Sequence, residues 1–538
     1  SCLYGIICIR ITPFLGTYSK YAIMTTCHVC NGSKLNQRTL NYTVGGLNYS
    51  QVESLEISSL KFWIANFNDS KITEDKKIFV KQLKDSILQK IDALEKLNVG
   101  YLCLNRSVPS LSGGERQRIR IATQLTCSLK GLIYILDEPC KGLHYRDIES
   151  IIDATRNLIK KENTVVAIEH NKKYISKADY KIELGPEGGP GGGYLISAGA
   201  ENNAQSLILK FKKENEFVDY LKFENINFRN ISKQKAMFPI GGITCITGVS
   251  GSGKSTLVTA LAESLDKNTA RKYGEIYDGE SIKRIIKVNQ SPIGKTPRST
   301  VVSYLGIFDE IRMLFSKTSM AKELKLSPTM FSMNIKGGRC ESCQGTGLQK
   351  IELNYLPSAY ITCPECNGRR YNEKIISVTY RNKTILDVLE TPIAEIIEIF
   401  NDTKKVYSVL RCMVELGLGY LTLGQMSMSL SGGEAQRIKL AKALGTLSRG
   451  KSLYILDEPT SGLNEIDIDR FIKVLFSLQN KGETILIIEH NIEFIAKVAD
   501  YIIDFGVYGG DLGGKIVAQG KPRDVFAKKD SSLCGLDG

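Results

Sequence analysis

Short apolar runs alternate with longer amphipathic stretches along this 538-residue chain. Between residues 72 and 97, apolar and charged positions recur with the period of a helix, and a second helical pattern covers residues 117–129. Residues 132–136 and 165–168 are instead continuous apolar runs of strand length, and acidic residues follow both. Strands of this kind between helices are typical of a parallel sheet that helices cover on both faces. We therefore expect an α/β fold in which these strands are buried.

Three short motifs occur twice, in the same order. They are Leu-Ser-Gly-Gly-Glu at 111–115 and 430–434, Leu-Asp-Glu-Pro at 136–139 and 456–459, and Ile-Glu-His-Asn at 168–171 and 488–491. These positions show that the offset between the two copies is almost identical for all three motifs. A constant offset indicates a duplicated domain. We expect two related units, separated by a polar, lysine-rich linker at residues 201–220.

Residues 248–255, Gly-Val-Ser-Gly-Ser-Gly-Lys-Ser, fit the phosphate-loop pattern G-x-x-x-x-G-K-S. An apolar strand at 243–247 precedes them and a helical run at 256–265 follows, which is the context such a loop requires. Its glycines let backbone N–H groups approach phosphates, its lysine reaches the β and γ oxygens, and its serine hydroxyl ligates Mg²⁺. The loop predicts a site for ATP with Mg²⁺. The residues expected to contact the nucleotide are Gly248, Ser250, Gly251, Gly253, Lys254, Ser255 and Thr256.

Acidic and histidine residues at the ends of two later strands complete this site. Asp457 is expected to hold the Mg²⁺ shell together with Ser255, and Glu458 to orient the attacking water. His490 is expected to contact the γ-phosphate. A lone histidine is more often a core residue. However, the chain has only four, and His170 and His490 occupy equivalent repeat positions.

The repeated Leu-Ser-Gly-Gly-Glu motif, followed by Gln-Arg, resembles the signature loop of the ATP-binding cassette superfamily. The resemblance implies that the signature of one unit closes over ATP held by the phosphate loop of the other. Exposed backbone N–H groups and the positive end of the following helix would then face the γ-phosphate. Ser112, Gly113 and Gly114 would complete the site of Lys254, with Gln290 as the γ-phosphate-sensing glutamine.

The phosphate loop occurs only once in the chain. A counterpart of Lys254 at the offset of the other motifs would precede residue 1, so we expect the first unit to be N-terminally incomplete. The reciprocal site is then expected to be degenerate. Its residues would be Asp137, Glu138, His170, Ser431, Gly432 and Gly433.

Six of the 14 cysteines form three C-x-x-C pairs. Cys340, Cys343, Cys363 and Cys366 supply two of these pairs, with residues 344–362 between them, and they predict a tetrahedral four-thiolate zinc site. A chain without a secretory signal is expected to use such pairs for metal rather than for disulfides. The third pair is Cys27 and Cys30.

A zinc module between the phosphate loop and the signature resembles the UvrA family, the damage-recognition subunits of bacterial excision nucleases. Further motifs that carry the resemblance lie at 288–299, 306–312, 337–341 and 416–420, and it covers roughly residues 22–530. It implies two tandem cassette units, the first incomplete, and an inserted zinc module. The expected divisions are 1–60 (remnant of a first zinc module), 61–200 (part of the first unit), 201–220 (linker) and 221–538 (second unit, with zinc module at about 330–375).

Two features depart from the family pattern. The partners of Cys27 and Cys30 would map to Tyr4 and Ile7, which cannot ligate zinc, so a complete first zinc site is not expected. No upstream segment that docks a UvrB-like partner is visible in the sequence.

The net charge of +14 favours a polyanionic partner. With the resemblance, it implies damaged double-stranded DNA as the partner, bound without base reading. A second copy of the chain is a further expected partner, as is a UvrB-like protein if the docking domain exists upstream. No membrane association is expected, and the expected location is cytoplasmic. The candidate DNA contacts are Lys295, Arg298, Arg339, Arg369 and Arg370.

Three other hypotheses remain open at this point. The chain could be a stand-alone relative that protects against drug–DNA adducts without UvrB, or an inactive remnant of a longer gene. It could also be the ATPase subunit of a transporter, against which the zinc insert and the fused repeats argue. In the favoured hypothesis the chain is an ATPase and not itself a nuclease.

Overall fold

The computed structural model describes residues 27–535 except 28–29, 68–72, 109–110, 112, 127–128, 186–191, 201–208, 266–271, 290–292, 295–297, 352–358, 446–450 and 464. The chain divides into two compact units, Ser1–Glu169 and His170–Gly538. Within the described residues, no helix is long and apolar enough to cross a membrane.

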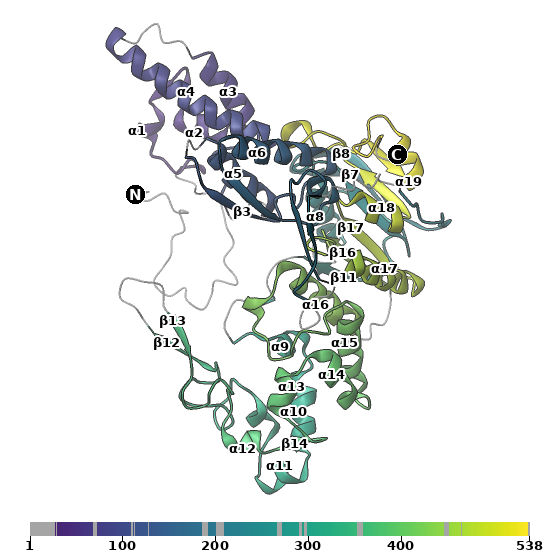
Figure 1. Cartoon of the computed structure of the whole chain (residues 1–538). Coiled ribbons are helices and arrows are strands. Elements are labelled where there is room, and N and C mark those ends of the chain that lie inside the picture. Colours follow the sequence, from purple (N-terminus) through teal and green to yellow (C-terminus); the bar gives the residue numbers. More distant parts are fainter. Residues whose placement is uncertain are drawn as a thin grey trace. The chain divides into compact units, whose positions relative to one another are not determined.

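The first unit begins with a small helical bundle (Figure 1). Helix α3 buries Ile57, Leu60 and Ile64, which lie on one face at helical spacing, and they pack with Ile91 of α4. The amphipathic pattern at 72–97 is confirmed as a helix, because α4 spans Glu74–Lys96. The elements are α1 (Gln37–Leu40), β1 (Thr43–Val44), β2 (Leu47–Asn48), α2 (Tyr49–Ser54), α3 (Ile57–Ala65), α4, α5 (Gly113–Leu125), β3 (Ile133–Asp137), η3 (Tyr145–Asp147), α6 (Ile148–Lys160) and β4 (Thr164–Ile168).

The two predicted apolar strands of this unit form, but they are not buried as expected. β3 and β4 pair in parallel, with Asp137 opposite Ile168. Alternate residues on one face are open to solvent, and Ile133 and Ile135 are 70% and 73% exposed. The prediction of burial was wrong because, within the described part of the chain, β3 and β4 pair only with each other.

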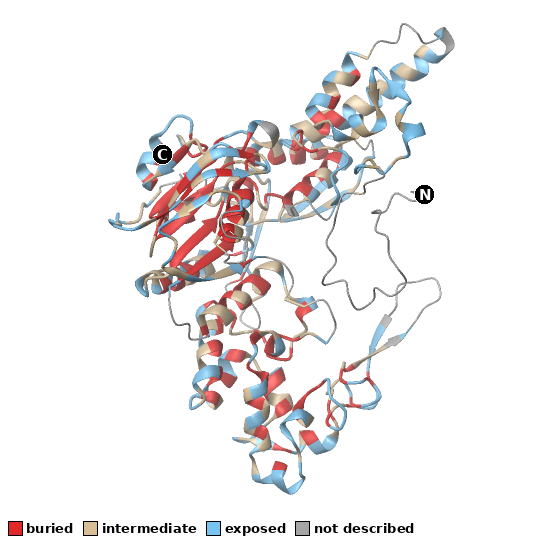
Figure 2. Cartoon of the chain, turned by 180° about the vertical axis from the view of Figure 1, so that it is seen from behind, coloured by how far each residue is buried: buried red, intermediate tan, exposed pale blue. Residues whose placement is uncertain are grey.

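The second unit is built on a six-stranded sheet of order β11-β16-β17-β9-β18-β19. Five strands are parallel and only β19 is antiparallel to its neighbour, β18. The central strands β9 (Ile243–Thr247) and β17 (Thr484–Ile488) are buried throughout, as the red strands in Figure 2 show. Helix α8 packs Leu257 and Leu261 into the core that these strands share with β7 and β8. The predicted parallel α/β sheet is therefore present in this unit.

The remaining cassette elements follow in chain order. They are α7 (Lys172–Ile175), β5 (Lys181–Gly185), β6 (Tyr194–Gly199), β7 (Tyr220–Phe228), β8 (Ile231–Pro239), α8 (Lys254–Ser264), β10 (Glu275–Tyr277), β11 (Ile282–Val288), α16 (Gly432–Gly445), β16 (Lys451–Asp457), α17 (Glu465–Asn480), α18 (Ile492–Val498), β18 (Tyr501–Asp504), η8 (Gly510–Leu512), β19 (Ala518–Gly520) and α19 (Pro522–Ala527).

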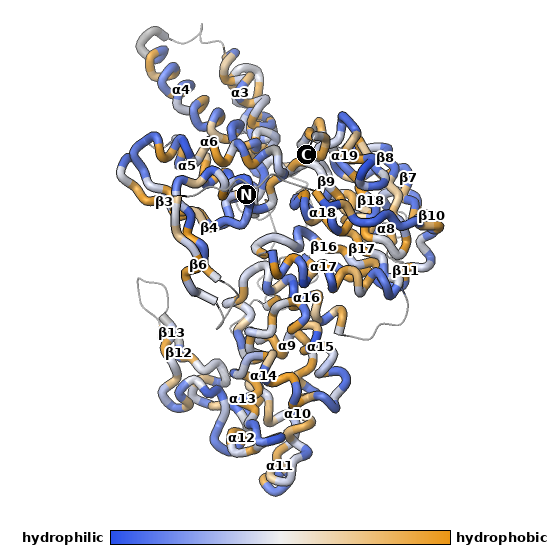
Figure 3. Tube along the Cα trace, turned by 45° about the vertical axis from the view of Figure 1, so that its right-hand side comes forward, coloured by the Kyte–Doolittle hydropathy of each residue, from blue (hydrophilic) through white to orange (hydrophobic). Residues whose placement is uncertain are grey.

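A helical insert separates β11 from α16. Hydrophobic and hydrophilic segments alternate along its helices in Figure 3, and α10 and α15 each bury one apolar face. The insert contains α9 (Val301–Leu305), α10 (Phe308–Ser316), α11 (Ser319–Glu323), η5 (Pro328–Phe331), β12 (Leu348–Ile351), β13 (Ala359–Thr362), α12 (Glu373–Ile376), β14 (Thr379–Tyr380), β15 (Lys383–Thr384), α13 (Ile385–Glu390), α14 (Ile393–Ile396), η6 (Ile397–Phe400), α15 (Lys404–Glu415) and η7 (Ser427–Ser429).

Candidate nucleotide-binding site and metal centre

The phosphate loop connects β9 to α8, and glycine holds it open. Gly248 and Gly253 have φ values of 127° and 114°, which other residues rarely adopt. A Cβ atom at Gly248 would also lie 2.9 Å from the Cβ atom of Phe505. Lys254 Nζ donates hydrogen bonds to the carbonyl oxygens of Gly248 and Val249, at 2.8 and 2.7 Å. The loop therefore surrounds its lysine. Phosphate oxygens could replace the two carbonyl oxygens as acceptors of the lysine's hydrogen bonds.

A second glycine-rich segment, which contains Gly510 and Gly514, holds the backbone of the phosphate loop by hydrogen bonds. This role was not predicted from the sequence. The Gly514 N–H donates to the Ser252 carbonyl at 2.8 Å, and the Gly510 N–H donates to the Gly251 carbonyl at 3.2 Å. Gly514 has a φ of 78°, and a Cβ atom there would lie 1.8 Å from the Asn230 carbonyl oxygen. Only glycine fits at this position.

The acidic and histidine residues predicted for the site gather at the carboxyl ends of β16 and β17. Asp457 is the last residue of β16 and pairs with Ile488, two residues before His490. Burial raises the pKa of Asp457, and the positive charge of Lys254 opposes that rise. His490 Nε2 lies 3.7 Å from Glu458 Oε1. The second unit thus brings its lysine, both carboxylates and the histidine into one site.

Glu458 has a left-handed backbone. Its φ is 47°, and Glu138, the equivalent residue of the first repeat, has a φ of 48°. A non-glycine residue in this conformation costs on the order of 1–3 kcal/mol and persists only where its surroundings enforce it. In both repeats the glutamate N–H donates, at 2.9 Å, to the carbonyl of the last strand residue, Ile488 or Ile168, which is also the first residue of the Ile-Glu-His-Asn motif. The strain therefore belongs to the motif and recurs in each unit.

The buried Glu489 connects two loops of the site and was not singled out from the sequence. Its carboxylate accepts hydrogen bonds from the Thr460 N–H at 3.2 Å and hydroxyl at 2.9 Å. It also accepts from the N–H groups of His490 at 2.8 Å and Asn491 at 3.2 Å. Burial raises the pKa of Glu489, and these donors counteract the rise. The carboxylate therefore ties the loop after Glu458 to the loop that carries the histidine.

The second signature begins α16 with a reciprocal cap. The Glu434 carboxylate accepts from the Ser431 N–H at 2.7 Å, and the Ser431 hydroxyl accepts from the Glu434 N–H at 3.2 Å. The Tyr420 hydroxyl donates to the same carboxylate at 2.5 Å. Tyr101 and Glu115 form the equivalent contact in the first unit, at 2.7 Å. The tyrosine of the 416–420 motif thus fixes the signature glutamate, which gives that motif a physical role.

Some of the site residues predicted for the first repeat lie in the first unit. Others lie in the second unit or outside the described residues. Gly113 and Gly114 begin α5, while Asp137 ends β3 and precedes Glu138. His170 is the first residue of the second unit and is exposed. Ser112, Gln290 and Lys295 lie outside the described residues.

The four predicted metal ligands come together in the insert. Their Sγ atoms all lie within 4.8 Å of one another, and Cys343 Sγ is 3.7 Å from Cys366 Sγ. A tetrahedral site with Zn–S bonds of about 2.3 Å has S–S edges of roughly 3.8 Å. The two C-x-x-C turns flank the hairpin β12–β13, and Cys340 and Cys363 are also buried. The thiols therefore have the spacing that a four-coordinate zinc ion requires.

The thiols do not ionise alike. Burial opposes ionisation of Cys363, but N–H groups of Cys366 and Glu365 outweigh it and lower its pKa to about 7. Burial raises the pKa of Cys366 to about 12.

The basic residues proposed for DNA contact differ in their exposure and in the protein groups that they already bind. Arg298 is exposed and donates to the Gln344 side chain at 3.1 Å. The Arg339 side chain is only 10% exposed and bonds the Asn334 carbonyl. Arg370 donates to the Gly424 carbonyl at 2.9 Å. Arg369 pairs with a neighbouring glutamate at 2.7 Å. Of the described candidates, only Arg298 is exposed.

Comparisons with known proteins agree with this architecture. A family model described as "ABC transporter" matches residues 233–461. The UvrABC system protein A of Staphylococcus aureus is 40% identical over 95% of this chain and 56% of its own length. That of Clostridium perfringens is 42% identical over 95% of the chain and 56% of its own length. The crystal structure of UvrA2 from Deinococcus radiodurans superposes with a TM-score of 0.87 at 37% identity, covering 94% of this chain and 66% of that one.

The chain belongs to the UvrA family. The expected family and the tandem cassette fold are thereby confirmed. The chain spans about half the length of the curated UvrA relatives it matches. The cassette match begins in β8 and ends in the loop after β16, so it contains the phosphate loop, the second signature and Glu458.

Proposed function

We propose that the second unit of this UvrA-family chain binds and hydrolyses ATP with Mg²⁺. The convergence of Lys254, Asp457, Glu458 and His490 on one phosphate loop supports this proposal. The cassette match and the UvrA relatives support the same reaction. The loop fits a polyphosphate because its glycines leave the backbone bare and its lysine is already directed inward.

Each residue has a separate task in this proposal. Lys254 moves its hydrogen bonds from loop carbonyls to phosphate oxygens. Ser255 and Asp457 would hold Mg²⁺, which when bound would supply positive charge beside the phosphoryl group that is transferred. Glu458 accepts a hydrogen bond from the attacking water and orients it. His490, beside Glu458, faces the γ-phosphate.

Steady-state ATPase measurements on the full chain test this assignment. Lys254→Ala is expected to abolish nucleotide binding. Glu458→Gln is expected to retain binding and to lower kcat at least about a hundredfold, because it removes the group that acts on water. Glu398→Gln, which changes an exposed glutamate of the insert, is the matched control. Unchanged turnover in Glu458→Gln would refute the assignment.

We also propose that the chain takes the part of protein A in a UvrABC-type system. It would bind damaged double-stranded DNA through backbone contacts and deformability, and pass it to a UvrB-like partner. The relatives' names and the net charge of +14 support this. Arg298 is the described basic residue that we favour as a phosphate contact. We assign zinc to the four clustered cysteines on the basis of their spacing and donor chemistry.

Fluorescence anisotropy with a duplex that carries one bulky adduct, and with the same duplex unmodified, tests the DNA assignment. We expect tighter binding to the adduct in the presence of ATP, and co-purification with a UvrB-like protein. Adduct binding without any UvrB association would instead support the stand-alone self-protection function. Equal affinity for both duplexes would contradict damage recognition.

A further inference from the structure

The peptide bond between Asp457 and Glu458 is held from both sides. On one side, the Glu458 N–H donates to the Ile488 carbonyl at 2.9 Å. On the other side, Gln436 Nε2 donates to the Asp457 carbonyl oxygen at 2.8 Å. Gln436 lies one turn into the signature helix α16, whose first residue is Gly432. A side chain of the signature helix therefore holds the peptide that aims the glutamate.

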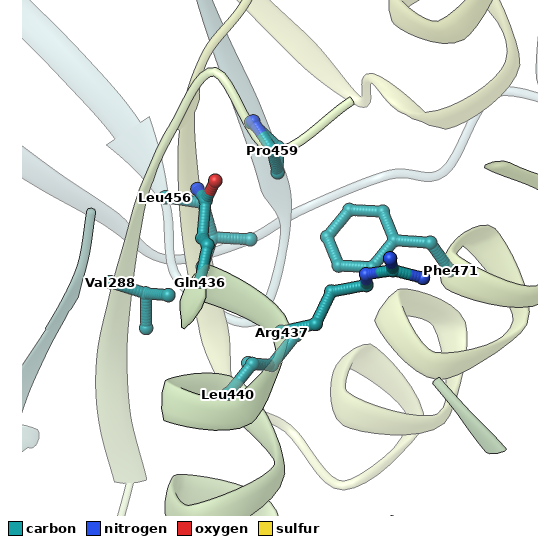
Figure 4. A pocket seen from close by; sticks show the side chains of 7 residues that line it. All are labelled: Val288, Gln436, Arg437, Leu440, Leu456, Pro459 and Phe471. Atoms are coloured by element: carbon teal, nitrogen blue, oxygen red, sulfur yellow. The ribbon is translucent and has the colours of Figure 1, made fainter. Parts of the chain in front are cut away.

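The surroundings of Gln436 leave it little freedom. The residue is only 3% exposed. Figure 4 shows it beside Leu456 and Pro459, with Val288 and Phe471 lining the same small cavity. The neighbouring Arg437 donates to the Leu416 carbonyl at 3.2 Å, which anchors α16 to the preceding segment. The amide is thus packed among apolar groups, where its hydrogen bond to Asp457 fixes the backbone.

The first repeat has the same arrangement, formed by different residues in a separate unit. Gln117, in α5, donates to the Asp137 carbonyl at 2.5 Å. Arg118 donates to the carbonyls of Leu97 and Asn98, both at 3.2 Å. Glu138, which follows Asp137, has the same left-handed φ as Glu458. The recurrence ties the glutamine bond to the strained glutamate and not to one local sequence.

We infer that Gln436 is a positioning residue for Glu458. Through the hydrogen bond of Gln436, the signature helix sets the direction in which the catalytic carboxylate of the same unit points. The inference rests on the proposed ATPase function. A residue in this strained conformation persists only where its surroundings enforce it, and the Ile488 carbonyl holds only the N–H side of the peptide, so that Gln436 holds its carbonyl side. When the signature moves on contact with nucleotide, α16 moves Gln436 and with it the Asp457–Glu458 peptide.

Gln436→Met tests this, since methionine keeps the volume among the apolar neighbours but cannot donate a hydrogen bond. We expect kcat for ATP to fall roughly tenfold, which corresponds to about 1.4 kcal/mol, while KM stays within about twofold. Gln436→Glu, of equal size, places a carboxylate against the Asp457 carbonyl and is expected to lower kcat further. Gln425→Met, a half-buried glutamine whose side chain contacts Ser429, is the matched control.

Amide hydrogen exchange of residues 455–462 provides a second readout that does not depend on turnover. Exchange at Glu458 should rise in both Gln436 variants and stay unchanged in the control, with melting temperatures showing that all variants are folded. If the wild-type chain does not hydrolyse ATP, the proposed function fails, and exchange still decides the positioning role. Wild-type kcat or wild-type exchange in both Gln436 variants would overturn the inference.

Discussion

Removing one ligand of the cysteine cluster is expected to unfold the tip of the insert without unfolding the cassette. We choose Cys363→Ser, because this thiol is fully buried in the cluster. The hairpin that it anchors has little apolar burial of its own, since Tyr360 and Ile361 are 55% and 45% exposed. The four thiols themselves form the buried cluster of this region. A metal bound by these thiols would therefore supply most of the local stability.

The expected magnitude is large. Structural zinc sites of small modules contribute on the order of 10–16 kcal/mol of apparent binding free energy at neutral pH. A loss of this size exceeds what a short hairpin can replace, so residues 338–371 should exchange their amides at the rate of an unfolded segment. Elemental analysis should find one zinc per chain in the wild type and almost none in Cys363→Ser. Chelation should reproduce the variant's exchange pattern.

The control is Cys412→Ser, which changes a half-buried free thiol of α15 outside the cluster and should retain full zinc. Full zinc occupancy in Cys363→Ser would refute the four-thiolate assignment. A zinc-free wild type whose hairpin amides are nevertheless protected would refute the argument that metal holds this region together.

Three further outcomes follow from the geometry. Glu489→Gln should lower the free energy of unfolding by about 1–3 kcal/mol in urea titrations, because its amide N–H₂ meets donors instead of accepting from them; no loss would contradict the network at Thr460 and His490. Gly514→Ala should cost more free energy of ATP binding than free energy of unfolding, as judged from the melting temperature, since its Cβ would lie 1.8 Å from the Asn230 carbonyl beside the phosphate loop. Unaltered affinity would show that this support is dispensable. If about six phosphates are contacted, the slope of log K against log salt should be roughly −5, and a flat response would reject backbone binding by the basic surface.

The sequence predicts the second unit better than the first, for a physical reason. Around Lys254, the strand, loop and helix are contiguous, so local pattern and motif together determine the fold. The same apolar pattern at residues 132–136 led to a wrong prediction of burial, because burial depends on neighbouring strands and not on the strand itself. Ile133 and Ile135 are apolar in either environment.

The residues that sequence reasoning missed act through contacts between distant segments. Gln436 bonds the carbonyl of Asp457, 21 residues away, and Tyr420 bonds Glu434 across a loop. The Gln-Arg pair after each signature was visible as a motif, yet only the structure shows what its glutamine holds. Glu489 was read as part of a histidine motif, and its four hydrogen bonds emerge only when the loops around it are placed.

The strand order of the second sheet has a consequence for how the chain folds as it is synthesised. Ile243 of β9 pairs with Ile485 of β17, and the whole insert, the signature helix and β16 lie between them in the sequence. At a synthesis rate of roughly 5–20 residues per second, β9, which is buried throughout in the folded sheet, waits on the order of tens of seconds for its neighbour. The phosphate loop is thus among the first parts of this unit to leave the ribosome and among the last to gain its surroundings. Meanwhile the insert can fold by itself on local contacts, and nascent chains that stop before β17 should expose β9 to chaperones or to aggregation.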